Sequence, residues 1–234
     1  MEHKLEWLTK EEGRLVFLEK KVPFLTMKVF VMGEEAAEFQ LQDVVWNKNK
    51  AKNDSIQEEV TLKMTECISE AFRLLWDEGF EETILVERQG TKNAEILDST
   101  GVVRLLYSEY MMTSRFDTQK STDCGRTFLK LTKTETGYDC ENEEQTFFCR
   151  LMSYEVSSPR ERSFYLYEVE VKEDRRNQGI ASACLEELFR YLAEELPVFI
   201  MLQVGSYNEP AVHLYKKLGF EVSEELRYYA ATEE

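Results

Sequence analysis

The sequence has few of the residues that build metal sites, disulfide frameworks or membrane spans. It contains two histidines, His3 and His213, and five cysteines with no CxxC pair, so a zinc site of the usual spacing cannot be assembled. No apolar run approaches the roughly 20 residues that cross a bilayer, and the charged N-terminus lacks the basic-then-apolar order of a signal peptide. We therefore expect free thiols, no metal, and a soluble protein of the cytoplasm.

Basic residues are also scarce. The chain has 29 Lys and Arg against 45 Asp and Glu, a net charge of −16. This charge repels a nucleic-acid backbone and favours a cationic partner such as an amine, although many soluble proteins are acidic for solubility alone. With 43% hydrophobic residues among 234, the chain can build a substantial core, and its length fits one sizeable domain or one full and one reduced domain.

In the first hundred residues the apolar pattern predicts mainly helix. Residues 1–40 are expected to be helical at first, then to pass through an apolar stretch to an acidic helix start at Glu34. The Asn- and Lys-rich run 46–59 predicts a surface loop. Apolar residues at three- and four-residue steps predict an amphipathic helix from Val60 to Leu75, and the β-branched segment 82–87 predicts a short buried strand.

From residue 102 the apolar period changes to two, which predicts strands. The four candidates, separated by polar turns, form an antiparallel meander in residues 102–112, 126–132, 146–156 and 164–171. A helix closed by Pro197, a buried strand over 198–204, a helix from Glu209 to Leu218 and a final pair of strand segments follow. A right-handed crossover would make the 198–204 strand parallel to its predecessor. The predicted fold class is α/β, with a mixed, largely antiparallel sheet flanked by helices.

One internal similarity favours a duplication. The order helix, strand 82–87, Asn93 to Gly101, strand is repeated later as helix, strand 198–204, Asn208 to Gly219, strand. The alternative is a pair of unrelated strand–helix–strand units, which are common in α/β chains. A degenerate N-terminal half-repeat is therefore one of two interpretations.

The segment that carries chemistry lies between the strand 164–171 and the next helix. It has the pattern R-x-x-G-x-A and consists of Arg176, Asn177, Gln178, Gly179, Ile180 and Ala181. The first amides of a helix have no intrahelical partners and face the positive end of the helix dipole. Because Gly179 allows close backbone approach, these amides can bind an anion such as a pyrophosphate. The alternative is a tight strand-to-helix turn with no ligand.

At this point the sequence resembles the GNAT superfamily of N-acetyltransferases, which uses such a loop to bind acetyl-coenzyme A. The resemblance runs from about Phe164 to Tyr229 and includes YEVEV, RRNQGIA and IMLQVGSYNEPAVHLYKKLGF. The segments YEVEV and RRNQGIA are similar to those of the aminoglycoside 3-N-acetyltransferase-like subgroup. Upstream the chain departs from the family, because only a short polar link, not a strand and two helices, precedes the antiparallel strands.

The resemblance implies a role for individual residues. The backbone of Val169, Glu170 and Val171 would pair with the pantetheine arm, and the amides from Arg176 to Ala181 would bind the pyrophosphate. Asn208 would hold the pantetheine or its loop. Tyr215 would be the general acid for the departing thiolate, since a phenol pKa of about 10 is close to a thiol pKa of about 8.5.

An acidic residue is also expected to act as the base that frees the amine. Strand alternation places Glu168 and Glu170 on the face opposite Val169 and Val171. Glu168 is the candidate base and Glu170 the reserve, with a water relay as a third option. Without these roles, Tyr215 is a packed core aromatic and both glutamates lie on an exposed strand face.

The resemblance predicts two regions and one activity. Residues 1–117 would be a reduced or rearranged GNAT-like region, and residues 118–234 the acetyl-CoA-binding catalytic region. The chain would transfer an acetyl group to a primary amine of a small cationic molecule by direct attack in a ternary complex. The alternatives are a catalytically silent acyl-CoA-binding or regulatory module and a protein or peptide N-acetyltransferase. Neither nucleic acid nor a membrane is expected as a partner, and a homodimer stays open.

Overall fold

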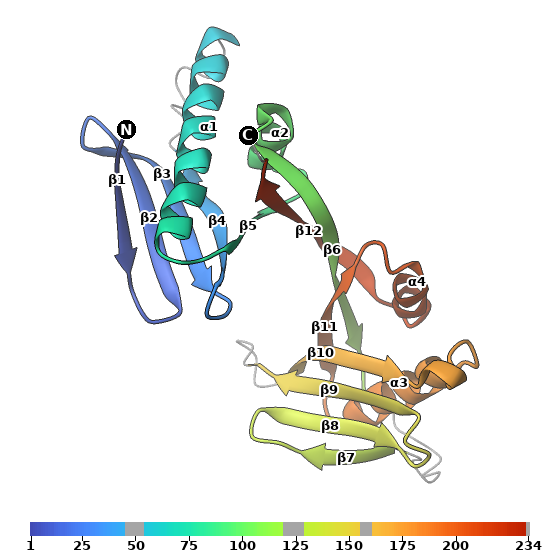
Figure 1. Ribbon diagram of the computed structural model, residues 1–234. Coiled ribbons are helices and arrows are strands. Elements are labelled where there is room, and N and C mark those ends of the chain that lie inside the picture. Colours follow the sequence, from blue (N-terminus) through green and yellow to red (C-terminus); the bar gives the residue numbers. More distant parts are fainter. Residues whose placement is uncertain (45–53, 119–128, 155–160, 233–234) are drawn as a thin grey trace. The chain divides into compact units, whose positions relative to one another are not determined.

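The computed structural model describes residues 1–44, 54–118, 129–154 and 161–232 (Figure 1). Two compact units make up the chain: Met1–Ser108 with Glu225–Glu234, and Glu109–Glu224. The strands β6 (Val103–Phe116) and β12 (Glu221–Ala231) each contribute residues to both units. The division of the sequence into 1–117 and 118–234 stays a prediction.

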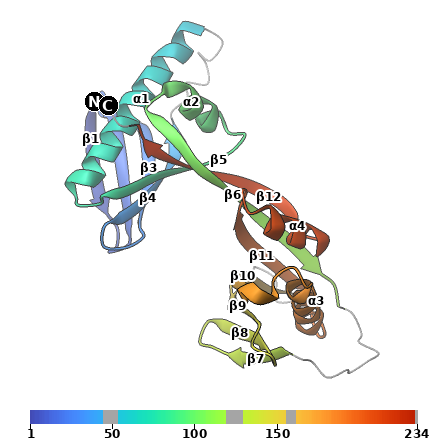
Figure 2. The same cartoon turned by 45° about the vertical axis from the view of Figure 1, so that its right-hand side comes forward.

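The first unit is a sheet covered by one long helix. Its elements are β1 (Glu2–Trp7), β2 (Glu12–Glu19), β3 (Val22–Val31), β4 (Ala36–Val44), α1 (Asp54–Asp77), β5 (Glu82–Arg88), α2 (Lys92–Thr100) and the start of β6. The strands β1 to β4 are antiparallel neighbours, β5 lies parallel to β4, and β12 lies beside β5. Residues Met64, Ile68 and Phe72 of α1 pack on this sheet, and Figure 2 shows the helix crossing its strands. The predicted helix 60–75 and strand 82–87 are confirmed.

The prediction of helix in residues 1–40 is wrong, because this segment forms β1 to β4. In β2, Leu15 and Phe17 are buried while Arg14 is exposed, which is the alternation of a strand with one face in the core. The turn that closes the β2–β3 hairpin is formed by Lys20 and Lys21, both with positive φ (51° and 66°). Hairpin turns of this kind usually contain Asn or Gly. Because Lys occupies both positions, the sequence does not indicate this turn.

The second unit has the same architecture. Its elements are β7 (Leu129–Lys133), β8 (Gly137–Asn142), β9 (Phe147–Ser153), β10 (Arg162–Val171), a 3-10 turn (Glu173–Arg175), α3 (Ile180–Leu192), β11 (Val198–Gly205), α4 (Glu209–Lys217) and β12. The strands β7 to β10 form an antiparallel meander, and β11 is parallel to β10 as predicted. Apolar residues of α3 and α4 pack on one face of these strands.

Three strand predictions in this unit need correction. The segment 137–142 was expected as a polar turn but forms β8, whose Cys140 is buried against the core. The strand expected to begin the meander, β6, instead pairs with β11. The expected final pair of strand segments is one continuous strand, β12.

The internal duplication extends to details of the backbone. Each half of the chain runs through four antiparallel strands, a helix, a parallel strand, a helix and a last strand. The β4–β5 pairing stops after Gln40 and Val86, and the β10–β11 pairing stops after Leu166 and Leu202. A bulge follows in the fourth strand of each half, at residues 41–43 and 167–170. The predicted mixed α/β fold class with an N-terminal half-repeat is thereby confirmed.

The structure also corrects the alignment of the two halves. The sequence aligned Asn93 with Asn208, but the N-cap residues of the equivalent helices α2 and α4 are Thr91 and Asn208. Both helices have nine residues. The residue of the first half that corresponds to Asn208 is therefore Thr91, not the nearby Asn93.

The four cysteines in the described part of the chain are unpaired and buried: Cys67, Cys140, Cys149 and Cys184. Cys124 lies outside the described residues. Burial raises the pKa of the Cys184 thiol to about 11, so this thiol stays protonated near neutral pH. Among the described residues, none of the helices has both the length and the hydropathy of a membrane span.

Candidate active site

The site is built where two parallel strands separate. The strands β10 and β11 are paired from Arg162 and Val198 to Leu166 and Leu202. Beyond this point, which we call the fork, β10 continues to Val171 and β11 continues to Gly205 beside β6. One edge of β10 is therefore not paired with β11 past Leu166. An open strand edge can accept an extended ligand as an additional strand.

A β-bulge lies directly past the fork in β10. Tyr167 is opposite Arg150 of β9 and Glu170 is opposite Phe148, so three steps of β10 match two steps of β9. Glu168, inside the bulge, has φ of 50°. The bulge interrupts the alternation expected for residues 168–171, and Glu170 lies in the same cleft as its two valine neighbours.

The loop after β10 leads into a helix N-terminus that lacks the usual caps. Asn177 and the N-cap residue Gly179 have positive φ (61° and 79°), and the α3 N-cap has no side-chain hydrogen bond and no acidic residue in its first turn. By contrast, Thr91 caps α2 and Asn208 caps α4. Amides of an uncapped first turn, at the positive end of the helix dipole, are suited to bind an anion.

These features meet in one cleft of about 940 Å³, a size typical of small-molecule sites. Its lining includes most of the predicted site residues: Val169, Glu170, Val171, Arg176, Asn177, Gly179, Ile180, Ala181, Asn208 and Tyr215. Three basic side chains (Lys172, Arg175, Arg176) and two acidic ones (Glu170, Glu173) also line it. The cleft therefore has a small local excess of positive charge in a chain of net charge −16.

Comparison with known proteins agrees with this geometry. Residues 133–220 match the model of the Acetyltransferase (GNAT) family. These residues are a GNAT acetyltransferase domain. The match confirms the predicted enzyme class, whereas the likeness to the aminoglycoside 3-N-acetyltransferase-like subgroup stays a prediction. None of the curated protein sequences matches the chain.

Solved structures share the GNAT fold across most of the chain. A GCN5-related N-acetyltransferase from Sphaerobacter thermophilus superimposes with a TM-score of 0.59 at 12% identity, covering 96% of this chain and 81% of its own. A GCN5-related N-acetyltransferase from Kribbella flavida gives 0.55 at 8% identity, with coverages of 89% and 87%. A tandem GNAT protein from the clavulanic acid biosynthesis pathway gives 0.53 at 10% identity, with coverages of 94% and 82%. The fold of both units is therefore shared with known GNAT structures.

Three predicted residues of the GNAT domain make contacts that shape the cleft. Arg176 Nε donates to the carbonyl of Val171 at 3.2 Å, which ties the loop to the end of β10. The Asn208 carboxamide oxygen accepts from the Ala211 amide at 3.3 Å, as an N-cap. Gln178 is not among the lining residues, since its amide donates to the Asp174 carbonyl at 3.2 Å within the loop.

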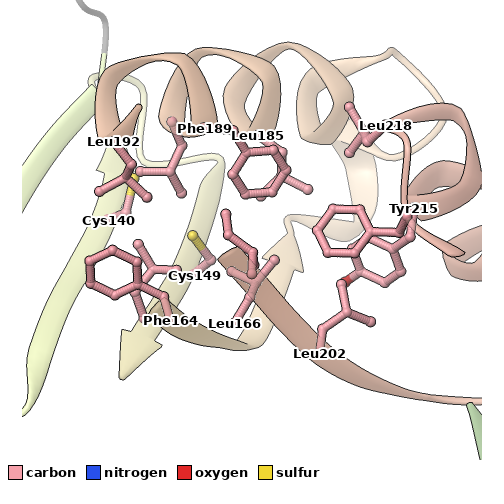
Figure 3. Packing of buried hydrophobic residues seen from close by; sticks show 14 of the residues in the cluster. Cys140, Cys149, Phe164, Leu166, Leu185, Phe189, Leu192, Leu202, Tyr215 and Leu218 are labelled. Atoms are coloured by element: carbon pink, nitrogen blue, oxygen red, sulfur yellow. The ribbon is translucent and has the colours of Figure 1, made fainter. Parts of the chain in front are cut away.

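Tyr215 lies at the boundary between the core of the GNAT domain and the cleft. Its side chain is 7% exposed and packs edge-on against Phe220, with ring centroids 5.8 Å apart. Figure 3 shows it among the apolar side chains of the core cluster. Burial raises the pKa of Tyr215 to about 12. The phenol is therefore protonated, and able to donate a hydrogen bond, over the whole physiological range.

Glu168 lies outside the set of residues that line the cleft. Its side chain is 48% exposed, and its carboxylate accepts from Arg150 of β9 at 2.8 Å. Arg150 also contacts Asp139 of β8, at 3.2 Å. The Glu168 carboxylate is thus held toward β9, on the side of β10 that faces away from β11.

The sequence did not indicate several lining residues. Gln145, Thr146, Phe147 and Phe148 line the cleft because the bulge brings the start of β9 opposite Glu170 and Val171. A bulge leaves no signal in a single sequence. Ala211, in contrast, lies four residues before Tyr215 on α4, and helical periodicity alone places it on the same face.

The first unit keeps the fork and the bulge without the chemistry. Its sequence between β4 and α1 has no R-x-x-G-x-A pattern, and that segment, 45–53, lies outside the described residues. Seven residues after the N-cap of α2, at the place equivalent to Tyr215, stands Asp98. Asp98 accepts from Arg227 at 2.7 Å and from the Tyr229 hydroxyl at 3.0 Å. The groups expected to bind and activate a thioester thus belong to the second unit.

Proposed function

We propose that this protein is an acetyl-CoA-dependent N-acetyltransferase that acetylates a primary amine of a small cationic molecule by direct attack in a ternary complex. The observation that carries the proposal is one cleft that combines the open edge of β10 with the uncapped N-terminus of α3. An extended amide-containing arm fits a strand edge, and a pyrophosphate fits uncapped amides. Acetyl-CoA has both parts.

In this proposal the coenzyme follows the lining of the cleft. The pantetheine arm pairs with the backbone of Val169, Glu170 and Val171, and the pyrophosphate is bound by the amides from Arg176 to Ala181. Lys172 and Arg175 supply positive charge beside these amides. Asn208 supports the arm indirectly, since its side chain is used to cap α4.

The reaction then needs one base and one acid. The acceptor ammonium loses a proton through a water molecule to Glu168, whose carboxylate lies outside the cleft lining. The nitrogen lone pair forms the C–N bond, the C–S bond breaks, and its electron pair goes to sulfur. Sulfur takes a proton from Tyr215, and the second proton lost by nitrogen restores the phenol through solvent. The products are an amide and a free thiol.

Binding of acetyl-CoA tests the first part of the proposal. A ligand that binds only the folded state raises the midpoint of thermal unfolding. We expect the unfolding midpoint to rise with acetyl-CoA at 1 mM. It should rise less with pantetheine, which lacks the pyrophosphate. The absence of any shift with acetyl-CoA would contradict the coenzyme assignment.

Glu168→Gln tests the base. If Glu168 takes the proton, the variant loses turnover by about 100-fold, and the acidic limb of its pH–rate profile becomes flat. Glu170→Gln is the matched control, because Glu170 is the next glutamate of the same strand and lies in the cleft. Loss of turnover in Glu170→Gln alone would transfer the role to Glu170, and normal turnover in both would leave water as the base.

A further inference from the structure

The second unit's sheet has a face opposite α3 and α4, and polar and aromatic side chains gather on it at the fork. Leu202 and Val204 of β11 point into the core. Gln203 and Gly205 alternate with them along the strand, so they belong to this second face. Directly opposed residues share a face, and Glu109 of β6 lies opposite Gly205. Tyr165 of β10, between the buried Phe164 and Leu166, shares it too.

Glu109 is held in place at this position. The Gln203 side-chain amide donates a hydrogen bond to its carboxylate. Gln203 is the first residue of β11 past the fork, where β10 no longer pairs with it. The Glu109 carboxylate therefore belongs to β6, the strand next to β11, and the proposed thioester would end at the fork between β10 and β11.

Two tyrosines lie on the same face of the sheet as this carboxylate. Tyr165 is close enough for the charge of Glu109 to raise the pKa of its phenol, in addition to the larger effect of burial. The ring of Tyr207 occupies the space that a side chain at Gly205 would fill, directly across from Glu109. Tyr207 is itself 76% exposed. A carboxylate near aromatic side chains is a chemical environment that binds ammonium groups, through an ion pair and cation–π contacts.

We infer that Glu109 binds the ammonium group of the acceptor, with Tyr165 and Tyr207 as its aromatic walls and Gln203 as the residue that positions the carboxylate. The inference rests on the proposed acetyl transfer and adds the acceptor side of the site. The coenzyme would enter along the open edge of β10, and the amine would approach the fork from the second face. A larger residue at position 205 would displace the Tyr207 ring from this place.

The test separates recognition of the amine from binding of the coenzyme. Thiol release is measured with acetyl-CoA and three cationic amines, spermidine, kanamycin and a peptide with a free N-terminus, and the best of these is used with the variants. We expect Glu109→Gln to raise KM for the amine about tenfold or more, because a charged hydrogen bond is lost. Its kcat and its affinity for acetyl-CoA should change little. Glu221→Gln, which removes the same charge from an exposed position of the same unit, should behave as the wild type.

Tyr207→Ala gives a second variant that does not disturb the core. We expect KM for the amine to rise about two- to fivefold, the loss of one exposed cation–π contact, with unchanged unfolding temperature. An unchanged KM in Glu109→Gln would overturn the inference, as would equal loss of acetyl-CoA affinity, which would indicate a structural role. If acetyl-CoA binds but no thiol is released with any of the three amines, the assignment of Glu109 to the amine is wrong and the coenzyme assignment stands. If acetyl-CoA does not bind, the proposed function falls and the inference with it.

Discussion

Gly179→Ala is expected to raise the dissociation constant of acetyl-CoA by at least about tenfold. Two effects contribute. Gly179 has φ of 79°, a conformation that costs an L-residue about 1–2 kcal/mol, and relief of this strain would turn the first amides of α3 away from their present direction. A methyl group would also project where the phosphate must approach the backbone, since no protein atom lies within 4 Å of that position. Isothermal titration with acetyl-CoA measures the change.

Gly101→Ala is the matched control for this experiment. Gly101 has φ of 71°, also has open space around the added methyl group, and ends α2 in the first unit. Both variants should lose a similar amount of stability, about 1–2 kcal/mol. Only Gly179→Ala should lose affinity for the coenzyme. Equal affinity in the two variants would show that the α3 N-terminus does not bind the pyrophosphate.

Tyr215→Phe is expected to reduce kcat by about 100-fold while the affinity for acetyl-CoA stays near that of the wild type. The substitution removes one hydroxyl and keeps the ring that packs against Phe220. Single-turnover thiol release measures the step directly. Tyr138→Phe is the control: Tyr138 packs edge-on against Phe164 of the same core cluster but does not line the cleft. If Tyr215→Phe retains full turnover, the phenol is a packing residue only.

The raised pKa of Tyr215 adds a prediction for stability at alkaline pH. The folded-state pKa is about 12 and the unfolded value is about 10. The stabilisation is therefore fully present below pH 10 and is lost as the pH rises from 10 to 12. Urea unfolding across this range should show a shallower decline of the free energy of unfolding in Tyr215→Phe than in the wild type. Parallel curves would contradict the burial of the phenol in solution.

The sequence predicted the helices α3 and α4 and the loop before α3, because their signals are local. A glycine between a strand and an amphipathic helix specifies the α3 N-terminus, and Gly219 marks the end of the α4 segment. The residues that we propose for the acceptor side could not be predicted in this way. Glu109 and Gln203 are far apart in the sequence, and only the pairing of β6 with β11 brings them together. No local periodicity or motif in the sequence indicates which strand pairs with which.

The N-terminal half shows a second limit of sequence patterns. Its strands carry many charged residues, so their alternation is visible only at positions such as Leu15 and Phe17. The turn of two lysines with positive φ has no residue that usually marks such a turn. Strand β8 has the same pattern, because Asp139 and Glu141 flank its buried Cys140. Charge on the solvent face thus outweighed the apolar signal of the other face.

The exchange of last strands between the two halves affects how the protein is made. β5, whose other neighbour is β4, needs Leu226–Tyr229 of β12 beside it, and these residues follow Arg88 by more than half the length of the chain. Pairings so distant in sequence form slowly, because a long loop must close first. During synthesis the first unit to leave the ribosome is therefore the last to be completed. Until β12 is made, the β5 edge is unpaired and exposed to chaperones or to aggregation.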